Sequence, residues 1–196
     1  NNTTAAKLFC KKSEYGDFNE LISPYSFGKE YSLSGYSVSP DNKYLLFTLS
    51  KGGTDWDELR IYDFTKGKYK EEVLTGLLSI NSVWKGDGFY YLRYNVGSYR
   101  TDKFGRISNK SIICYHKIGQ DQQKDEVMSW IDSSYTIESI RDIENSDKFL
   151  VKCIKERGGK IYTFYKIIST ASQTESVKDI IVIPGSDFHY LGCARD

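Results

Sequence analysis

Short stretches of this sequence alternate apolar and polar residues, and the stretches recur in the same order along the chain. Alternation with a period of two is typical of β-strands that bury one face. The first copy contains four such stretches, and a turn at Pro40–Lys43 separates the first from the second. The stretches are Leu33–Ser39, Tyr44–Leu49, Glu58–Asp63 and Tyr69–Leu74. They predict a four-stranded antiparallel sheet.

Two further copies of this pattern follow. The second contains Ile80–Trp84, Phe89–Tyr94, Ile112–His116 and Val127–Met128, and the third contains Ile137–Ile143, Lys148–Ile154, Ile161–Tyr165 and the weaker stretch Ile180–Ile183. Equivalent tyrosines, Tyr62, Tyr115 and Tyr165, are spaced 53 and then 50 residues apart. This period is close to the roughly 40–50 residues of one four-stranded propeller blade.

The sequence therefore predicts an all-β fold, a partial β-propeller of about three four-stranded antiparallel blades. The expected blades span residues 33–75, 79–130 and 135–184, and a further blade starts at 188–196 with the run His189–Cys193. Each predicted hairpin turn carries Asp or Asn with Gly, Ser or Lys, which suits the backbone of tight turns. Residues 1–32 do not fit the repeat and are expected to form a lead-in segment, with a weak helical pattern around Glu14–Ile22 that Pro24 ends.

Charge and hydropathy limit the classes of partner that we expect for this chain. Lys and Arg number 27 against 26 Asp and Glu, without a long block of one sign, so nothing indicates a nucleic acid or an anionic membrane. Apolar runs such as Leu45–Leu49 are far shorter than the roughly 20 residues of a membrane span. We therefore expect neither a nucleic acid nor a membrane as a partner. Since no signal peptide is visible, we expect a cytoplasmic location.

Cysteine usage agrees with that location. Cys10, Cys114, Cys153 and Cys193 are widely spaced and form no C-x-x-C pair. We interpret them as buried, reduced thiols, and a disulfide between two of them is the alternative.

No pattern of catalytic or metal-binding residues stands out. A nucleophile elbow requires G-x-S-x-G, which does not occur in the sequence. The two histidines, His116 and His189, lie within strand-like runs, where a core role is the simpler interpretation. Neither H-E-x-x-H, clustered Cys and His, nor an Asp-rich calcium loop is found. We therefore expect no catalytic residue, metal ion or cofactor in this chain.

Three motifs in a fixed order carry a family resemblance: Gly35–Asp41, Gly53–Trp56 and Tyr115–Gln122. A Gly-x-Asp-Trp loop after the second strand of a blade, followed about one blade later by Tyr-His-x-x-Gly-x-Asp-Gln, resembles the early β-propeller of prolyl oligopeptidases (prolyl endopeptidases). The resemblance extends over about residues 31–196 and is clearest up to Gln122.

The resemblance implies a function for the propeller. The family consists of serine peptidases of a cytosolic type that cut short peptides after proline. An α/β-hydrolase domain holds the Ser, Asp and His, and a seven-bladed propeller covers the active site and excludes folded proteins. By this resemblance the chain is a non-catalytic portion that gates peptide access. Its partners are the hydrolase domain and short proline-containing peptides, and the chain alone should be inactive.

The resemblance also assigns candidate substrate-binding or gating residues. Tyr90 occupies the place of an aromatic residue that lines the substrate pocket. Lys155 occupies the place of an Arg that bonds a substrate carbonyl, but it offers a point charge instead of a bidentate fork. The cysteine that the family carries shortly afterwards is replaced by Gly158 or Gly159. Packing or ordinary surface roles are the alternatives at Tyr90 and Lys155.

Two loops complete the candidates. The long polar loop from Asn95 to Lys110, which includes Tyr99 and Arg100, corresponds to a family loop that helps gate substrate entry. Long loops inside compact domains are often functional, and a solvated surface insertion is the alternative. Trp56 is interpreted as a structural anchor whose indole packs between blades.

A second function class stays open. The chain could be a stand-alone or degenerate propeller-repeat protein that acts as a protein-binding scaffold. An open arc of blades leaves unpaired sheet edges, so self-association or marginal stability is expected.

Overall fold

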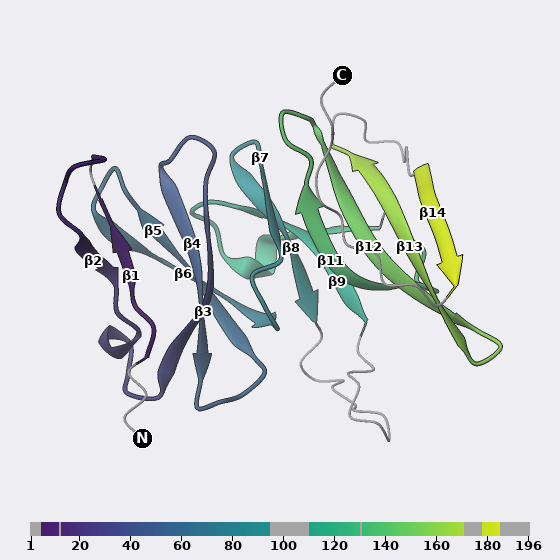
Figure 1. Cartoon of the computed structure of the whole chain (residues 1–196), viewed down its shortest axis with the longest axis horizontal. Helices are drawn as coiled ribbons and strands as arrows, with labels where there is room; N and C mark the ends of the chain where they lie inside the picture. Colours follow the sequence, from purple (N-terminus) through teal and green to yellow (C-terminus); the bar gives the residue numbers. More distant parts are fainter. Residues whose placement is uncertain (1–4, 12, 95–109, 130, 171–177, 185–196) are drawn as a thin grey trace. The chain divides into compact units, whose positions relative to one another are not determined.

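The structure is a computed structural model that describes residues 5–11, 13–94, 110–129, 131–170 and 178–184, the last of these as backbone only. These residues form two compact units, residues 1–80 and residues 81–196, which are treated separately below. Strands dominate both units (Figure 1). The part of the chain that is described contains no helix with the length and hydropathy of a membrane span.

The first unit contains one four-stranded antiparallel sheet in the order β3-β4-β5-β6. Its strands are β3 (Tyr31–Val38), β4 (Tyr44–Lys51), β5 (Asp57–Asp63) and β6 (Lys68–Leu77). The run Leu45–Leu49 is buried on both faces, as a central strand between two covered surfaces requires. Neighbouring strands in the chain are neighbours in the sheet, which is the meander expected of a propeller blade.

A two-stranded sheet precedes this blade. Strands β1 (Leu8–Cys10) and β2 (Asn19–Ile22) pair antiparallel, and the short 3-10 turn η1 (Pro24–Ser26) follows. The helical pattern expected around residues 14–22 is wrong, because residues 13–22 form a turn and strand β2. Leu21 and Ile22 face the apolar cluster of β3 and β4, so tertiary burial overrides the weak local preference.

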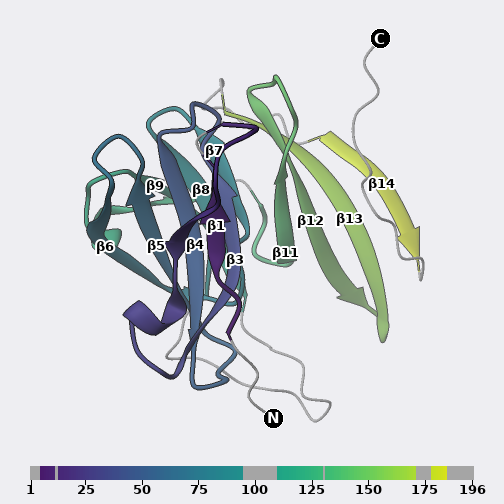
Figure 2. The ribbon, with the colours of Figure 1, turned by 60° about the vertical axis from the view of Figure 1, so that its left-hand side comes forward.

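The first blade of the second unit has the strand order β10-β9-β8-β7. Its strands are β7 (Ser82–Lys85), β8 (Gly88–Tyr94), β9 (Ser111–Lys117) and β10 (Glu126–Met128), with the 3-10 turn η3 (Gln122–Lys124) before β10. The second blade follows the order β11-β12-β13-β14, and Figure 2 shows these strands side by side. They are β11 (Thr136–Asp142), β12 (Lys148–Arg157), β13 (Lys160–Ser169) and β14 (Lys178–Pro184).

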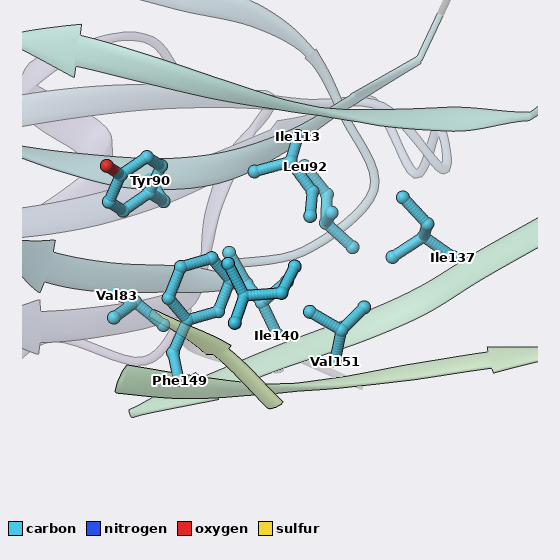
Figure 3. Packing of buried hydrophobic residues seen from close by; sticks show 9 residues of the cluster. Val83, Tyr90, Leu92, Ile113, Ile137, Ile140, Phe149 and Val151 are labelled. Carbon is cyan, nitrogen blue, oxygen red and sulfur yellow. The ribbon is translucent and has the colours of Figure 1, made fainter. Parts of the chain in front are cut away.

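The two blades of the second unit share one apolar core (Figure 3). Strands β7 to β9 contribute Val83, Tyr90, Leu92 and Ile113, and strands β11 to β13 contribute Ile137, Ile140, Phe149, Val151 and Ile168. Burial of each such side chain contributes about 1.5–3 kcal/mol. The packing of one blade face on the next, together with the strand order, confirms the predicted all-β partial propeller.

The predicted tight turns have the expected backbone. Asn42 and Asn145 adopt φ of 57° and 55°, and Gly67 and Gly86 adopt φ of 62° and 60°. In the first of these turns, the Asp41 carboxylate accepts from the Ser39 hydroxyl at 2.7 Å. This bond, and then the bonds and charge of Lys43, lower the pKa of Asp41 to about 2.

Several predicted strands differ in extent from the structure, and one predicted element lies outside the described residues. Strand β3 begins at Tyr31, so the repeat reaches into the segment expected as a lead-in. Strand β7 begins at Ser82, two residues after its predicted start. The run His189–Cys193, where a further blade is predicted to open, lies outside the described residues.

Gly88 provides a test of this architecture. A Cβ at this position would lie 2.0 Å from the carbonyl oxygen of His116 on the neighbouring strand β9. We expect Gly88→Ala to lower the free energy of unfolding by about 3 kcal/mol, because the strands must separate to admit the methyl group.

Gly158→Ala is the matched control. Gly158 also lies in the second unit, has a φ of 56°, and has open space around its Cβ position. Its substitution should cost only the left-handed backbone strain of about 1 kcal/mol. Urea unfolding followed by circular dichroism measures both variants, and equal losses would contradict the close approach of β8 and β9.

Candidate functional site

Of the sequence-predicted substrate-binding or gating residues, the structure describes Lys155 and Tyr90. Lys155 lies near the end of β12, and the loop containing Asn95, Tyr99 and Arg100 connects β8 with β9. These three loop residues lie outside the described residues, so their assignment stays a prediction. The residues that flank the loop and the surroundings of Lys155 are described.

The C-terminal flank of the loop is fastened to β11 and to the segment before it. Ser111 Oγ donates to the carbonyl of Ile137 at 2.5 Å, and Lys110 Nζ donates to the carbonyl of Ser133. Ile137 is paired with Cys153 of β12, two residues before Lys155. The structure therefore places Lys155 and the C-terminal anchor of the loop at the same end of the second unit.

Lys155 sits in a group that we call the Tyr135 cluster, formed by Ser134, Tyr135, Lys155, Phe164 and Lys166. Lys155 Nζ donates to Ser134 Oγ at 2.5 Å and lies 4.8 Å from the centre of the Tyr135 ring. Lys166 Nζ lies 4.7 Å from the same ring, and Phe164 meets that ring edge-on at 5.0 Å. Two ammonium groups thus share one aromatic ring.

Charge around the Tyr135 cluster is partly balanced by Asp132. The backbone N–H of Ser134 donates to its carboxylate at 2.8 Å. Hydrogen bonds from Ser134, with smaller contributions from the charges of Lys155 and Lys110, lower the pKa of Asp132. Lys166 is buried, whereas Lys155 is only partly buried and offers an ammonium donor suited to a carbonyl or carboxylate oxygen of a ligand.

Tyr90 lies in the core of the second unit. Its side chain belongs to the shared apolar core and only 9% of the residue is exposed. The ring stacks on Phe149 at 5.1 Å and lies 4.9 Å from the Tyr115 ring. Burial raises the pKa of its hydroxyl. The structure thus gives Tyr90 a packing role, and its contact with substrate stays a prediction.

A buried polar network, which sequence reasoning missed, occupies the connection between β9 and β10. His116 Nδ1 lies 2.8 Å from Asp125 Oδ1, and neither side chain has any exposed surface. The Tyr91 hydroxyl donates to Asp125 Oδ2 at 2.7 Å, and Gln122 Nε2 donates to the Tyr91 hydroxyl at 3.0 Å. Gln120 Nε2 lies 3.3 Å from Asp125 Oδ1.

Asp125 is the acceptor at the centre of this network. An ionised carboxylate can only accept, so His116 carries its proton on Nδ1. Among the described residues, the buried Nε2 of His116 has no hydrogen-bond partner. Burial, followed by the effect of Asp125, raises the pKa of Tyr91 well above its usual range. The motif Tyr115–Gln122 therefore closes the blade through buried hydrogen bonds.

His116 accordingly has the core role that the sequence indicated, and His189 lies outside the described residues. No group of three or more His, Cys, Asp or Glu side chains that could hold a metal ion is found within the described ranges. A single signal could have revealed the network from sequence: a strand histidine followed nine residues later by an aspartate that precedes the next strand.

The Gly53–Trp56 motif forms the turn between β4 and β5. Gly52 and Gly53 have φ of 61° and 72°, and Ser50 Oγ donates to the carbonyl of Thr54 at 2.8 Å. Trp56 is partly buried. The anchoring of its indole between blades stays a prediction.

The cysteines divide into two environments. Cys114 and Cys153 are buried free thiols, as expected, and burial raises the pKa of Cys114 to about 11. Cys10 is also free but is only partly buried, because it ends the short strand β1. Cys193 lies outside the described residues.

Comparison with known proteins gives a consistent result. The family model described as "Prolyl oligopeptidase, N-terminal beta-propeller domain" matches residues 18–175. The prolyl endopeptidase of Elizabethkingia meningoseptica is 25% identical over 174 residues, which cover 78% of this chain and 24% of that protein. The prolyl endopeptidase of Elizabethkingia miricola is 24% identical over a stretch of the same length.

Solved structures show the same fold. Prolyl oligopeptidase B from Galerina marginata, bound to a 35mer hydrolysis and macrocyclization substrate, superposes with a TM-score of 0.70 at 14% identity, over 97% of this chain and 30% of that chain. A structure from an analysis of two prolyl endopeptidases gives a TM-score of 0.64 at 18% identity, over 92% and 33%. The chain spans about a quarter of the length of the curated relatives it matches.

The buried network supplies one prediction. Asp125→Ala leaves two buried donors, the Tyr91 hydroxyl and the His116 Nδ1–H, without their acceptor. We expect a loss of about 3–5 kcal/mol in the free energy of unfolding. Asp121→Ala is the control, since Asp121 is exposed and its side chain makes no capping bond to η3. Chemical denaturation of both variants checks the expectation, and similar losses would contradict a network centred on Asp125.

The cysteine environments supply another prediction. At pH 8 in native buffer, iodoacetamide should modify Cys10, while Cys114 and Cys153 react only after urea is added. The reason is that Cys114, with a pKa of about 11, is protonated as well as buried. Peptide mapping by mass spectrometry gives the labelled sites. Rapid native labelling of Cys114 would show that the core around β9 is open.

Proposed function

This chain belongs to the prolyl oligopeptidase family, as part of the N-terminal β-propeller domain, and from that premise we propose that it is the non-catalytic portion of a serine peptidase, gating the access of short proline-containing peptides. The active site would lie on an α/β-hydrolase domain outside residues 1–196, which would also be its main partner. A cytoplasmic location belongs to the proposal and is supported by the free thiols of Cys10, Cys114 and Cys153.

The observation that carries the proposal is the grouping of Lys155 with the anchored end of the 95–110 loop. Both lie where β9 and β11 begin and β12 ends, so one end of the second unit holds the C-terminal flank of the candidate gating loop and a cationic side chain. Lys155 has a hydroxyl and an aromatic ring beside it that fix the direction of its ammonium group. A peptide carbonyl arriving at this end could accept from that group.

A relative supports the substrate class. Prolyl oligopeptidase B from Galerina marginata has a structure with a bound 35mer substrate. That observation belongs to the relative, and for this chain it makes a peptide the natural ligand to test. Tyr90 would contribute indirectly, because its ring stacks on Phe149 and so holds the two blades of the second unit together. The arrangement supports a propeller that positions peptides without performing the chemistry.

A chimera tests the proposal. Residues 18–175 of this chain would replace the matching segment of the Elizabethkingia meningoseptica prolyl endopeptidase, and cleavage of a Gly-Pro reporter peptide would be followed. The chimera should cleave the reporter, whereas the purified 196-residue chain should not. Cleavage by the purified chain alone would overturn the non-catalytic role.

Lys155→Ala in the same chimera tests the residue. We expect KM for the reporter to rise about tenfold with kcat within about twofold, as the loss of one charged hydrogen bond implies. Lys155→Arg should keep KM at or below the starting value, because its fork can bond a carbonyl. Lys148→Ala, at the opposite end of β12 and on an exposed residue, is the control. An unchanged KM for Lys155→Ala would remove Lys155 from the substrate path.

A further inference from the structure

Strand β5 carries a buried aspartate at each end. Asp57 is 5% exposed and Asp63 is 2% exposed, and both lie on one face of the sheet because they are an even number of positions apart. The Asp63 carboxylate accepts from the Thr65 hydroxyl at 2.6 Å and from the backbone N–H groups of Thr65 and Lys66 at 2.9 and 3.0 Å. These bonds, that of the hydroxyl first, lower the pKa of Asp63. The charged carboxylate therefore holds the turn that follows β5.

Asp57 has hydroxyl groups where Asp63 has backbone donors. Ser34 Oγ donates to Asp57 Oδ2 at 2.7 Å and lies 2.9 Å from Thr48 Oγ1. Ser34 is the extra residue of a bulge in the pairing of β3 with β4, and such a bulge re-aims a side chain. Burial raises the pKa of Asp57, and the bonds from Ser34 and Thr48 oppose this effect only in part.

The elements packed against Asp57 present uncharged groups to it. Ser50 of β4 and Leu77 of β6 are its direct partners across the sheet, so they lie on its face. Strand β3 contributes Ser32, which is paired with Ser50, and Ser34. The charged group that shares this face of β5 is the aspartate at its far end. Within the part of the chain that the structure describes, no positive charge contributes to the pKa of Asp57.

We propose that Asp57 is a proton-dependent latch for the turn Gly52–Trp56, which directly precedes it. The protonated carboxyl fastens the beginning of β5 to β3 and β4 through the hydroxyls of Ser34 and Thr48. The ionised carboxylate is a buried charge without a counter-ion, which loosens the beginning of β5 and the turn. Ser34 is exposed, so its hydroxyl connects the buried carboxyl with solvent. The inference concerns a pH-dependent conformation of the first unit and is independent of peptidase activity.

The protonation of each aspartate is linked to stability with opposite sign. Asp57 ionises at a higher pH in the folded chain than in the unfolded chain. Its contribution to stability therefore falls as the pH rises from about 4, the pKa of an unfolded aspartate, through the folded pKa. The contribution of Asp63 is present at neutral pH and is lost as the pH falls from about 4 through its lower folded pKa. The two ends of β5 thus respond to pH in opposite directions.

Amide hydrogen exchange followed by NMR on the full chain tests the latch. The protection factors of residues 57–59, which are corrected for the intrinsic exchange rate, should be at least about threefold lower at pH 7 than at pH 4 in the unchanged chain. Asp57→Asn keeps the shape of the side chain without its charge and should abolish this difference. Asp63→Asn is the matched control, because it neutralises the other buried aspartate of β5 and should leave the difference in place.

Ser34→Ala is a second variant that leaves Asp57 itself unchanged. Because Ser34 is exposed, the chain should keep its fold, which circular dichroism checks. Loss of the hydroxyl removes a bond to the ionised carboxylate, so the pKa of Asp57, measured by NMR titration of its carboxyl carbon, should rise further. A pKa of Asp57 at or below that of an exposed aspartate, protection at residues 57–59 that does not change with pH, or a decline that persists in Asp57→Asn would each overturn the proposal.

Discussion

Burial of apolar strand faces between adjacent sheets is the interaction on which this molecule depends. A blade buries little by itself, because alternate residues of every strand point out of the sheet. In the second unit, Phe149 of one blade stacks on Tyr90 of the other, and aliphatic residues fill the space around them. In the first unit, Ile22 enters the face formed by Leu45 and Phe47. Each sheet therefore needs a neighbour on each apolar face.

Polar contacts in this structure fix the positions of segments that apolar packing alone does not determine. The carboxylate of Asp125 holds Tyr91 and His116 in a place without exposed surface, which ties the segment before β10 to the centre of its blade. Burial of a polar group costs free energy that its hydrogen bonds offset. The network thus specifies one arrangement of the short strand β10, whose three residues offer little pairing of their own.

Much of the fold could be predicted from the sequence, since the blade repeat and its turns are local signals. Asn42 and Asn145 take the left-handed backbone that their turns require. The hairpin β1–β2 escaped prediction because strands of three and four residues show too little alternation. Tertiary contacts account for the remainder of the candidate site. No local pattern shows that Tyr90 faces Phe149, whereas the nine-residue spacing of His116 and Asp125 is a signal that the sequence analysis did not use.

Strand β6 has a consequence for solubility. It is the last strand of its sheet, and Lys68, Lys70, Glu71 and Glu72 place charges of both signs along it. Register shifts in its pairing with β5 also bend its course. Charged and irregular borders resist the addition of strands from other molecules, the first step toward amyloid fibres. The charges of β6 therefore oppose aggregation at this edge of the sheet, while its other edge pairs with β5.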